Sequence, residues 1–342
     1  VTPGGFTILC RAGDAAPSLA VYADPEGATN LAGQVGLEPY PLHTGNPGLL
    51  TGYERRQNWK QIREKTRGLG LAQFRVTGCA PGSTYYYRLT APSGGAVPET
   101  YPASTPLPGV TTPRENTFLP NAQQVLIEVP GVDTEGRIVT LAHPQAARAL
   151  SAVVGDGANT NQAWFNLGDL FDLAGAGNFT PLGLQEFTLT LLGGSDQDDL
   201  TQTLALNISP DFQVGSAASG SFGIEYFAIY LGSLIMRVGE TSSVPVTINC
   251  NARVTEISAD LHIPTDRLAD FTFTDVPGTV QTATLTPQSS TNALLLVRAA
   301  AGQAIQGQML LANLRFRAVS NQSSAFVPLK WSSLNVTKSG NE

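Results

Sequence analysis

The chain has 342 residues, enough for two or three domains of about 100–150 residues each. Charged residues make up only 14% of the sequence, against roughly 25% in a typical soluble protein, and the net charge is −7. This balance argues against a nucleic-acid-binding protein, which would carry a basic stripe to displace counterions. No apolar run of about 18 residues offers a membrane span.

The composition also predicts the fold class. Charged residues for helix surfaces are scarce, whereas 35 glycines and 23 prolines are available for turns between short strands. We therefore expect an all-β protein with three β-sandwich domains in series, over residues 1-112, 113-215 and 216-342. The chain begins at Val1 without a signal peptide, so we expect a processed or trimmed product.

Residues 1–112 show the period-two alternation of antiparallel strands. The segments are GGFTILCRA, SLAVYAD, LAQFRVTGC and TYYYRLTA, with a long polar stretch among them. That stretch contains a basic cluster, residues 54–67, with six basic and two acidic side chains. A site for phosphate or a polyanion is one interpretation of the cluster. A solvated loop or a short helix face is the interpretation that we favour.

The stretch FRVTGCAPGSTYYYRL resembles the E–F corner of a fibronectin type III domain, and the resemblance covers residues 4–112. It implies that Tyr85 closes a tyrosine corner, in which the hydroxyl bonds back to the backbone of the turn. Strand alternation then turns Tyr87 inward with Tyr85 and Tyr86 outward. The three tyrosines are therefore expected to be mainly core rather than a stacking platform for a ligand.

The three cysteines match no zinc-binding pattern. Cys10 and Cys79 depart from the fibronectin type III pattern, and both are expected to face the same core. A disulfide between them would suit an exported protein. Cys250 is expected to pack as a small hydrophobic residue.

The middle of the chain, residues 113–215, consists of strand-length apolar pieces separated by Gly, Pro, Asp and Asn. Such regular spacing predicts a second sandwich, of no family that we recognise. The Pro- and Thr-rich segment 103–116 is typical of a stiff linker. Segment 208–221 is rich in small residues and is expected to be a flexible boundary.

The last third of the chain contains the strand RVGETSSVPVTIN, the segment LANLRFRAV and the strand AFVPLKW. These motifs resemble the cohesin-like, carbohydrate-binding-module-type sandwich. The matching positions are Val238, Gly239, Val244, Pro245, Val246, Leu268, Leu311, Ala312, Leu314, Phe316, Ala318, Val327 and Leu329. A departure is HIPTD, where the family usually has a Tyr-Asp-Pro strand end.

The cohesin-like resemblance implies a flat sheet that is offered to a partner, such as a dockerin-type helix pair. The exposed residues of RVTEISADLHIP would contribute to that face. Trp331 could serve as an aromatic anchor for a sugar if it faced outward. Its alternation with Val327 and Leu329 instead predicts that it faces the core, which we favour.

Few residues carry the chemistry of a site. The stretch GSDQDDL offers Asp196, Asp198 and Asp199, carboxylates of the kind that hold Ca2+, but it lacks the Gly and the distal Glu of an EF-hand loop. A solvated hairpin tip is the interpretation that we favour. The turn GDGANTN, residues 155–161, resembles a calcium turn in the same way. No catalytic motif occurs, and no other cofactor is predicted.

We favour a non-catalytic, modular protein at the surface or exterior of a bacterium, for adhesion, scaffolding or ligand binding. Its partner would be a protein or a cell-surface glycan. The alternative is a set of accessory binding modules of a larger secreted hydrolase, a phosphatase or glycosidase, whose catalytic domain lies outside this chain. A third hypothesis is an enzyme with a site assembled between domains. Fold resemblance alone does not identify the ligand.

Overall fold

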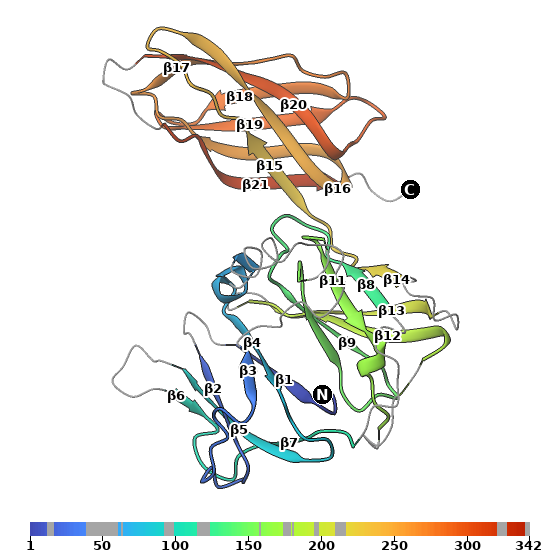
Figure 1. The fold of residues 1–342 in the computed structure, drawn as a ribbon. Helices are drawn as coiled ribbons and strands as arrows, with labels where there is room; N and C mark the ends of the chain where they lie inside the picture. The colour runs from blue at the N-terminus through green and yellow to red at the C-terminus, as the bar shows by residue number, and fades with distance from the viewer. Residues whose placement is uncertain are drawn as a thin grey trace. The chain divides into compact units, whose positions relative to one another are not determined.

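The computed structural model describes residues 1–11, 17–38, 61–62, 64–91, 99–114, 124–156, 159–173, 179, 181–194, 198–208, 217–319 and 327–338. The chain divides into two compact units, unit 1 (Val1–Gly223) and unit 2 (Ile224–Glu342). Strands make up nearly all of the regular structure in both units (Figure 1). Helix is limited, in the described part of the chain, to a 3-10 turn at Leu167–Asp169 and a short helix within residues 61–68. The all-β prediction is therefore confirmed.

The first core of unit 1 lies between two small sheets. One sheet has the order β1 (Gly5–Arg11), β4 (Leu71–Thr77), β3 (Gly36–Glu38). In the other, β5 (Thr84–Ala91) pairs with β2 (Ser18–Tyr22), β6 (Glu99–Tyr101) and β7 (Gly109–Thr111). Alternate residues of the longer strands fill the core, as the period-two pattern predicts: Phe6, Ile8, Leu19, Val21, Phe74, Val76 and Tyr85.

The remaining strands of unit 1 form two further sheets. The first has the order β10 (Leu150–Val153), β9 (Ile138–Ala142), β12 (Gly183–Leu191), β13 (Leu200–Ile208). The second has the order β11 (Gln162–Asn166), β8 (Gln124–Glu128), β14 (Ala217–Ser221). Large side chains from both sheets are fully buried, among them Ile127, Leu141, Phe165 and Phe187.

Strand β14 lies within the segment that the sequence marks as a flexible boundary. Residues 217–221 pair in parallel with β8, so they belong to unit 1, and unit 2 begins at Ile224. A Cβ on Gly220 would lie 2.2 Å from Cδ2 of Leu204, so a larger residue there would displace the leucine side chain that packs against the strand. This strand of small residues has no apolar alternation by which it could be predicted. The division of the chain into three domains stays a prediction.

A short helix within residues 61–68 connects the two halves of unit 1. Ile62 on this helix is buried in one cluster with Leu71, Ile138 and Val153. The cluster therefore contains side chains of the helix, of β4, of β9 and of β10. Residues 1–112 and the strands that follow them share this apolar contact.

The same helix contains the end of the basic cluster. The Lys65 Nζ lies 2.8 Å from Oε2 of Glu135, whose side chain is only 9% exposed. The Thr66 hydroxyl, which is buried, lies 2.6 Å from the carbonyl oxygen of Gly136. These contacts fit the predicted helix face and give Lys65 a structural role. Residues 54–60 and 63 lie outside the described residues, so the anion-site interpretation stays untested.

Unit 2 is a β-sandwich organised around one long strand, β16 (Thr241–His262). The first half of β16 pairs with β15 (Phe227–Leu231) and β20 (Ile305–Ala318), and β20 pairs with β17 (Leu268–Thr274). The second half of β16 pairs with β21 (Lys330–Lys338) and β19 (Asn292–Ala299), and β19 pairs with β18 (Val280–Pro287). The seven strands are thus hydrogen-bonded as one continuous sheet, and the two halves of β16 belong to opposite layers of the sandwich.

Most of the positions that carry the cohesin-like resemblance are packing residues in unit 2. Val244, Val246, Leu268, Leu311, Leu314 and Phe316 are buried in the core, and Val327 and Leu329 pack against it. Gly239 has a φ of 85°, in the left-handed region that favours glycine, which explains this position of the motif. Val238 is 57% exposed and does not share in the core.

Candidate functional site

The outer face of the sheet β21–β16–β19–β18 is the candidate site, because strand alternation places a defined set of side chains on it. The inward residues of its two central strands, such as Ile257, Leu261 and Leu295, are completely or almost completely buried. The side chains between them point away from the core. The outward set comprises Glu256, Ser258, Asp260 and His262 on β16, Asn292, Leu294, Leu296 and Arg298 on β19, Thr282, Thr284 and Thr286 on β18, and Lys330, Ser333, Asn335 and Thr337 on β21.

Two leucines occupy the middle of this outer face. Leu294 lies opposite Asp260 on one side and Thr286 on the other. Leu296 lies in the next outward row and has Thr284 as its neighbour on β18. Both leucines are half-buried, and neither belongs to the core cluster of unit 2. An apolar centre is therefore surrounded by hydroxyl and charged groups.

Polar contacts hold the rim of the face in place. The Arg298 guanidinium lies 2.7 Å from Oε2 of Glu256. The Ser333 hydroxyl donates to Oδ2 of Asp260 at 2.7 Å. The side chains of Arg298 and Glu256 are 55% and 36% exposed, so their ion pair is a surface contact.

The residues of this face, all of which the structure describes, include no Phe, Tyr or Trp. Trp331 on β21 is half-buried and packs against the core of unit 2, and its indole Nε1 is buried. The prediction that Trp331 faces the core is confirmed. An aromatic platform for a sugar is therefore missing from this face.

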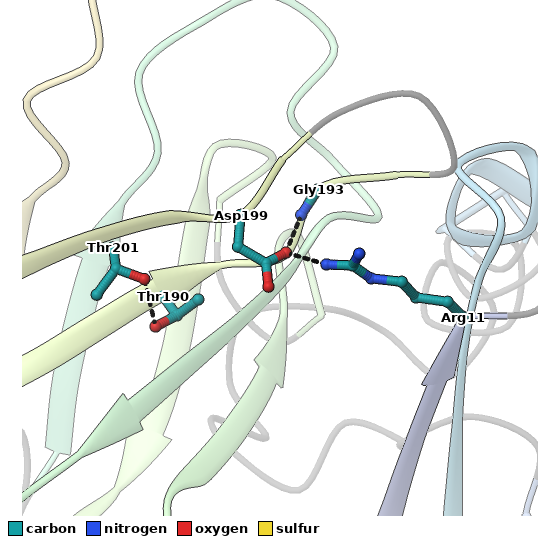
Figure 2. Close-up of polar contacts among 5 residues, drawn as sticks. All are labelled: Arg11, Thr190, Gly193, Asp199 and Thr201. Carbon is teal, nitrogen blue, oxygen red and sulfur yellow. Dashed lines mark hydrogen bonds and ion pairs between the residues drawn. The ribbon is translucent and has the colours of Figure 1, made fainter.

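In the acidic hairpin of unit 1, Asp199 has a structural role. Its Oδ1 accepts the Gly193 N–H at 2.8 Å and forms an ion pair with Arg11 of β1 (Figure 2). Asp198 is exposed, and Asp196 lies outside the described residues. Among the described residues, no group of three His, Cys, Asp or Glu side chains could hold a metal ion. Calcium binding at this hairpin stays a prediction.

Tyr85 has the geometry that the tyrosine-corner interpretation expects. The Ala80 N–H donates to the Tyr85 hydroxyl at 2.6 Å, and the tyrosine is 9% exposed. Tyr87 packs against the same core, whereas Tyr86 alternates to the other side and does not belong to that cluster. The predicted alternation of the triplet is confirmed. The fibronectin type III resemblance itself stays a prediction.

The expected closeness of Cys10 and Cys79 is wrong. Cys10 pairs with Ala72 at the far end of β1, whereas the Cys79 N–H donates to the carbonyl of Gly4 before the strand begins. Both thiols touch the same core, but they lie at opposite ends of a strand pair, and all three cysteines are free. Burial raises the pKa of Cys10, of Cys79 and of Cys250, so none is an activated nucleophile.

The sequence of β19 contains a signal for the outward leucines, which is missed when the segment is interpreted as an ordinary strand. Residues 293–297 read Ala-Leu-Leu-Leu-Val, an unbroken apolar run. A half-exposed strand would alternate, so a continuous run implies apolar side chains on both faces. In the structure, Ala293, Leu295 and Val297 face the core and Leu294 and Leu296 face outward.

No protein-family model and no curated protein matches the sequence. One third of the chain is similar to solved cohesin structures. The crystal structure of a complex between a CaDoc0917 variant and CaCohA2, a protein of Clostridium acetobutylicum, contains a chain that is 21% identical over 33% of this chain and 86% of its own, with a TM-score of 0.28. The Coh-OlpA-Doc918 complex of Clostridium thermocellum gives 12% identity over the same shares and a TM-score of 0.29.

A type II cohesin dyad from the ScaA scaffoldin of Acetivibrio cellulolyticus is similar over 94% of this chain and 83% of its own, with 10% identity and a TM-score of 0.23. In the part of the chain that the structure describes, no helix is long and apolar enough to cross a membrane.

Proposed function

We propose that the protein is a non-catalytic scaffolding or adhesion module that acts outside a bacterial cell and binds a protein partner through the outer face of the sheet β21–β16–β19–β18. The observation that carries this proposal is the pair Leu294 and Leu296, half-buried on the solvent side of a β-sandwich that already has a complete core. Apolar side chains in the centre of a face with a polar rim are the usual anatomy of a protein interface.

The chemistry of the face favours a protein over a glycan. Sugar sites usually offer an aromatic ring for stacking, and this face has none. A protein partner can instead pack an apolar side chain onto Leu294 and Leu296 and form hydrogen bonds with the threonines of β18. The cohesin-like motifs of the sequence imply a dockerin-type helix pair as that partner.

The size of the face limits what it can do alone. Four strands about 4.8 Å apart, with some seven residues of about 3.3 Å each, cover roughly 300–400 Å2. A standard interface buries about 800 Å2 on each partner. The partner is therefore expected to reach the loops around the face, or the complex is transient.

The proposal can be tested with a matched pair of variants of the full chain. Leu296→Arg places a desolvated charge at the centre of the proposed interface. Tyr230→Arg is the control, since Tyr230 is 42% exposed and lies on β15, which pairs with the first half of β16 rather than with the second. Each variant is immobilised and exposed to the secreted and cell-wall proteins of the source organism, and also to a glycan array.

We expect a protein that the wild-type chain and Tyr230→Arg retain and Leu296→Arg loses, with a loss of affinity of at least about 30-fold for a partner that is then purified, about 2 kcal/mol. Retention of the same protein by Leu296→Arg would contradict the proposal. Binding of a simple glycan by all three chains would point to another face and another class of ligand.

A further inference from the structure

Strand β13 of unit 1 is an edge strand whose outer edge has no partner among the residues that the structure describes. It lies at the end of the sheet order β10–β9–β12–β13 and pairs with β12 over all nine of its residues. Gln202 contacts the chain that follows β14 through its side chain, which donates to the Ser221 carbonyl and accepts the Gly223 N–H. Within the described ranges, no hydrogen bond joins the backbone of β13 to a strand other than β12. Such a row of unpaired N–H and C=O groups is a template for a further strand.

The other edge strands of seven or more residues carry features that oppose pairing. β1 ends at Arg11, and β17 has a register shift with Asp270 at a φ of 56°. β18 has a register shift and contains Pro287, and β21 has two register shifts and a lysine at each end. Charges, prolines and bulges of this kind keep edge strands from pairing. β13 has none of them, because its ladder is continuous and its sequence, LTQTLALNI, contains no charged residue and no proline.

Two inward leucines of β13 are left partly uncovered at this edge. Leu200 lies opposite the buried Leu191 and therefore faces the core, yet it is 41% exposed. Leu204 lies opposite Phe187, which is 1% exposed, but is itself only half-buried. A strand added beside β13 would cover both leucines and continue the apolar layer of the sandwich.

The start of β13 is held in place within unit 1. Asp199, directly before the strand, forms an ion pair with Arg11 and accepts the Gly193 N–H at 2.8 Å (Figure 2). At the first outward position, the hydroxyl groups of Thr201 and Thr190 share a hydrogen bond of 3.1 Å. The carboxylate at the start of the strand is thus paired within its own chain.

The side-chain pattern of β13 is suited to pairing with itself. The inward positions, apolar at both ends and at the centre, are Leu200, Gln202, Leu204, Leu206 and Ile208. The outward positions carry only threonine, alanine and asparagine. In an antiparallel pair of identical strands that is centred on Leu204, apolar ends meet apolar ends and no like charges meet.

We propose that β13 pairs with β13 of a second copy of this chain, antiparallel about a two-fold axis at Leu204. This register overlaps all nine residues and keeps inward residues opposite inward ones, with Leu200 opposite Ile208 of the second copy. It gives about eight to ten backbone hydrogen bonds between the two copies. The interface lies in unit 1 and is independent of the protein-binding face proposed for unit 2.

The dimer is expected to be weak, because one pair of strands is a small interface. Nine residues of about 3.3 Å each give a contact about 30 Å long, which is less than a standard interface. The fraction of dimer should therefore rise with protein concentration. Sedimentation equilibrium of the full chain from about 1 to about 500 µM measures that rise. We expect a reversible monomer–dimer equilibrium within this range, and a chain that stays monomeric throughout would overturn the proposal.

A pair of charge variants tests the register. In it, Thr201 lies opposite Asn207 of the second copy, and both positions are exposed. Thr201→Lys/Asn207→Lys brings lysines against lysines, and Thr201→Glu/Asn207→Glu brings glutamates against glutamates. Each double variant alone should weaken the dimer about fivefold or more. An equal mixture of the two should restore it, because opposite charges then face each other, and this restoration also shows that both variants fold.

Thr282→Lys/Thr286→Lys is the matched control, with the same change of charge at exposed positions of the edge strand β18 in unit 2. It should leave the monomer–dimer equilibrium unchanged. A control that weakens the dimer as much as the β13 variants would overturn the proposal, because the effect would then come from net charge or from β18. A mixture of the two β13 variants that dimerises no better than either alone would also overturn it.

Discussion

The hydrogen bond that Tyr85 forms depends on a single atom, its hydroxyl oxygen. Its hydroxyl is the acceptor for the Ala80 N–H, and the residue is buried. Tyr85→Phe leaves that N–H without its partner, so we expect the free energy of unfolding to fall by roughly 1–2 kcal/mol in chemical denaturation. Tyr86→Phe is the control and should change stability by less than about 0.5 kcal/mol. A larger effect at Tyr86 would mean that the two faces of β5 are exchanged.

Asp156 should make the stability of unit 1 depend on pH. Burial raises its pKa from 3.8 to about 7 in the folded protein, so the folded state holds the proton more tightly than the unfolded state. Stability is therefore fullest at the acidic end and is lost as the pH rises from about 4 to about 7. Each tenfold difference in proton affinity between the folded and unfolded states contributes about 1.4 kcal/mol to that loss.

Asp156→Asn removes this titration. We expect the free energy of unfolding of the variant to increase relative to that of the wild type between pH 4 and pH 8, because only the wild type loses the stabilising proton, as measured by urea denaturation at each pH. Asp169 still titrates in both proteins, so the comparison isolates Asp156. Asp198→Asn, at an exposed position, should follow the wild type. Parallel profiles for Asp156→Asn and the wild type would show that the carboxyl is ionised in the folded state at neutral pH.

At the scale of single elements, the alternation of apolar residues predicts where a strand lies and which face is buried. It does not predict what covers the other face of that strand. The alternation of β1 and β5 gives the correct core residues, because each strand is covered on one side by its own sandwich. It fails for β4, where Gln73 is covered by strands that come more than 60 residues later in the chain. It also fails to place Cys10 and Cys79 along the strands, because alternation gives the face of a residue but not its partner in the register.

The short helix within residues 61–68 makes a second prediction at this scale. Ile62 is 5% exposed and packs in a cluster to which both halves of unit 1 contribute. Ile62→Ala should lower the free energy of unfolding by about 2–5 kcal/mol, since it removes apolar contacts and leaves a cavity. Glu64→Ala, on the exposed side of the same helix, is the control. A loss of less than about 1 kcal/mol for Ile62→Ala would mean that the helix does not dock as described.

At the scale of the whole molecule, composition was enough to predict the fold class but not to predict how the chain divides into units. Low charge and frequent Gly and Pro predicted an all-β chain correctly. The Pro-rich segment 103–116 suggested independent domains on either side, yet Ile62 and Leu71 pack against Ile138 and Val153 across it. Contacts between distant segments leave no local signature in a sequence, and the burial of Gln73 depends on such contacts.

Calorimetric unfolding of the full chain distinguishes a division into two units from a division into three domains. Because the two halves of unit 1 share a buried cluster, we expect two transitions, one for residues 1–223 and one for residues 224–342. Ile62→Ala should lower the midpoint of the first and leave the second unchanged. Three transitions, with residues 1-112 unfolding separately, would support three autonomous domains instead.

The central claim, that a protein binds the outer face of β21–β16–β19–β18 in unit 2, is tested most directly by site-specific photo-crosslinking. A photoreactive phenylalanine derivative is incorporated at position 296 or, as a control, at position 230, and the full chain is illuminated with the secreted and cell-wall proteins of the source organism. The account predicts one dominant adduct with a polypeptide from position 296 and none from position 230. An excess of the wild-type chain should suppress the adduct, and an excess of the Leu294→Arg variant should not. Equal adducts from both positions, or an adduct from position 230 alone, would contradict it.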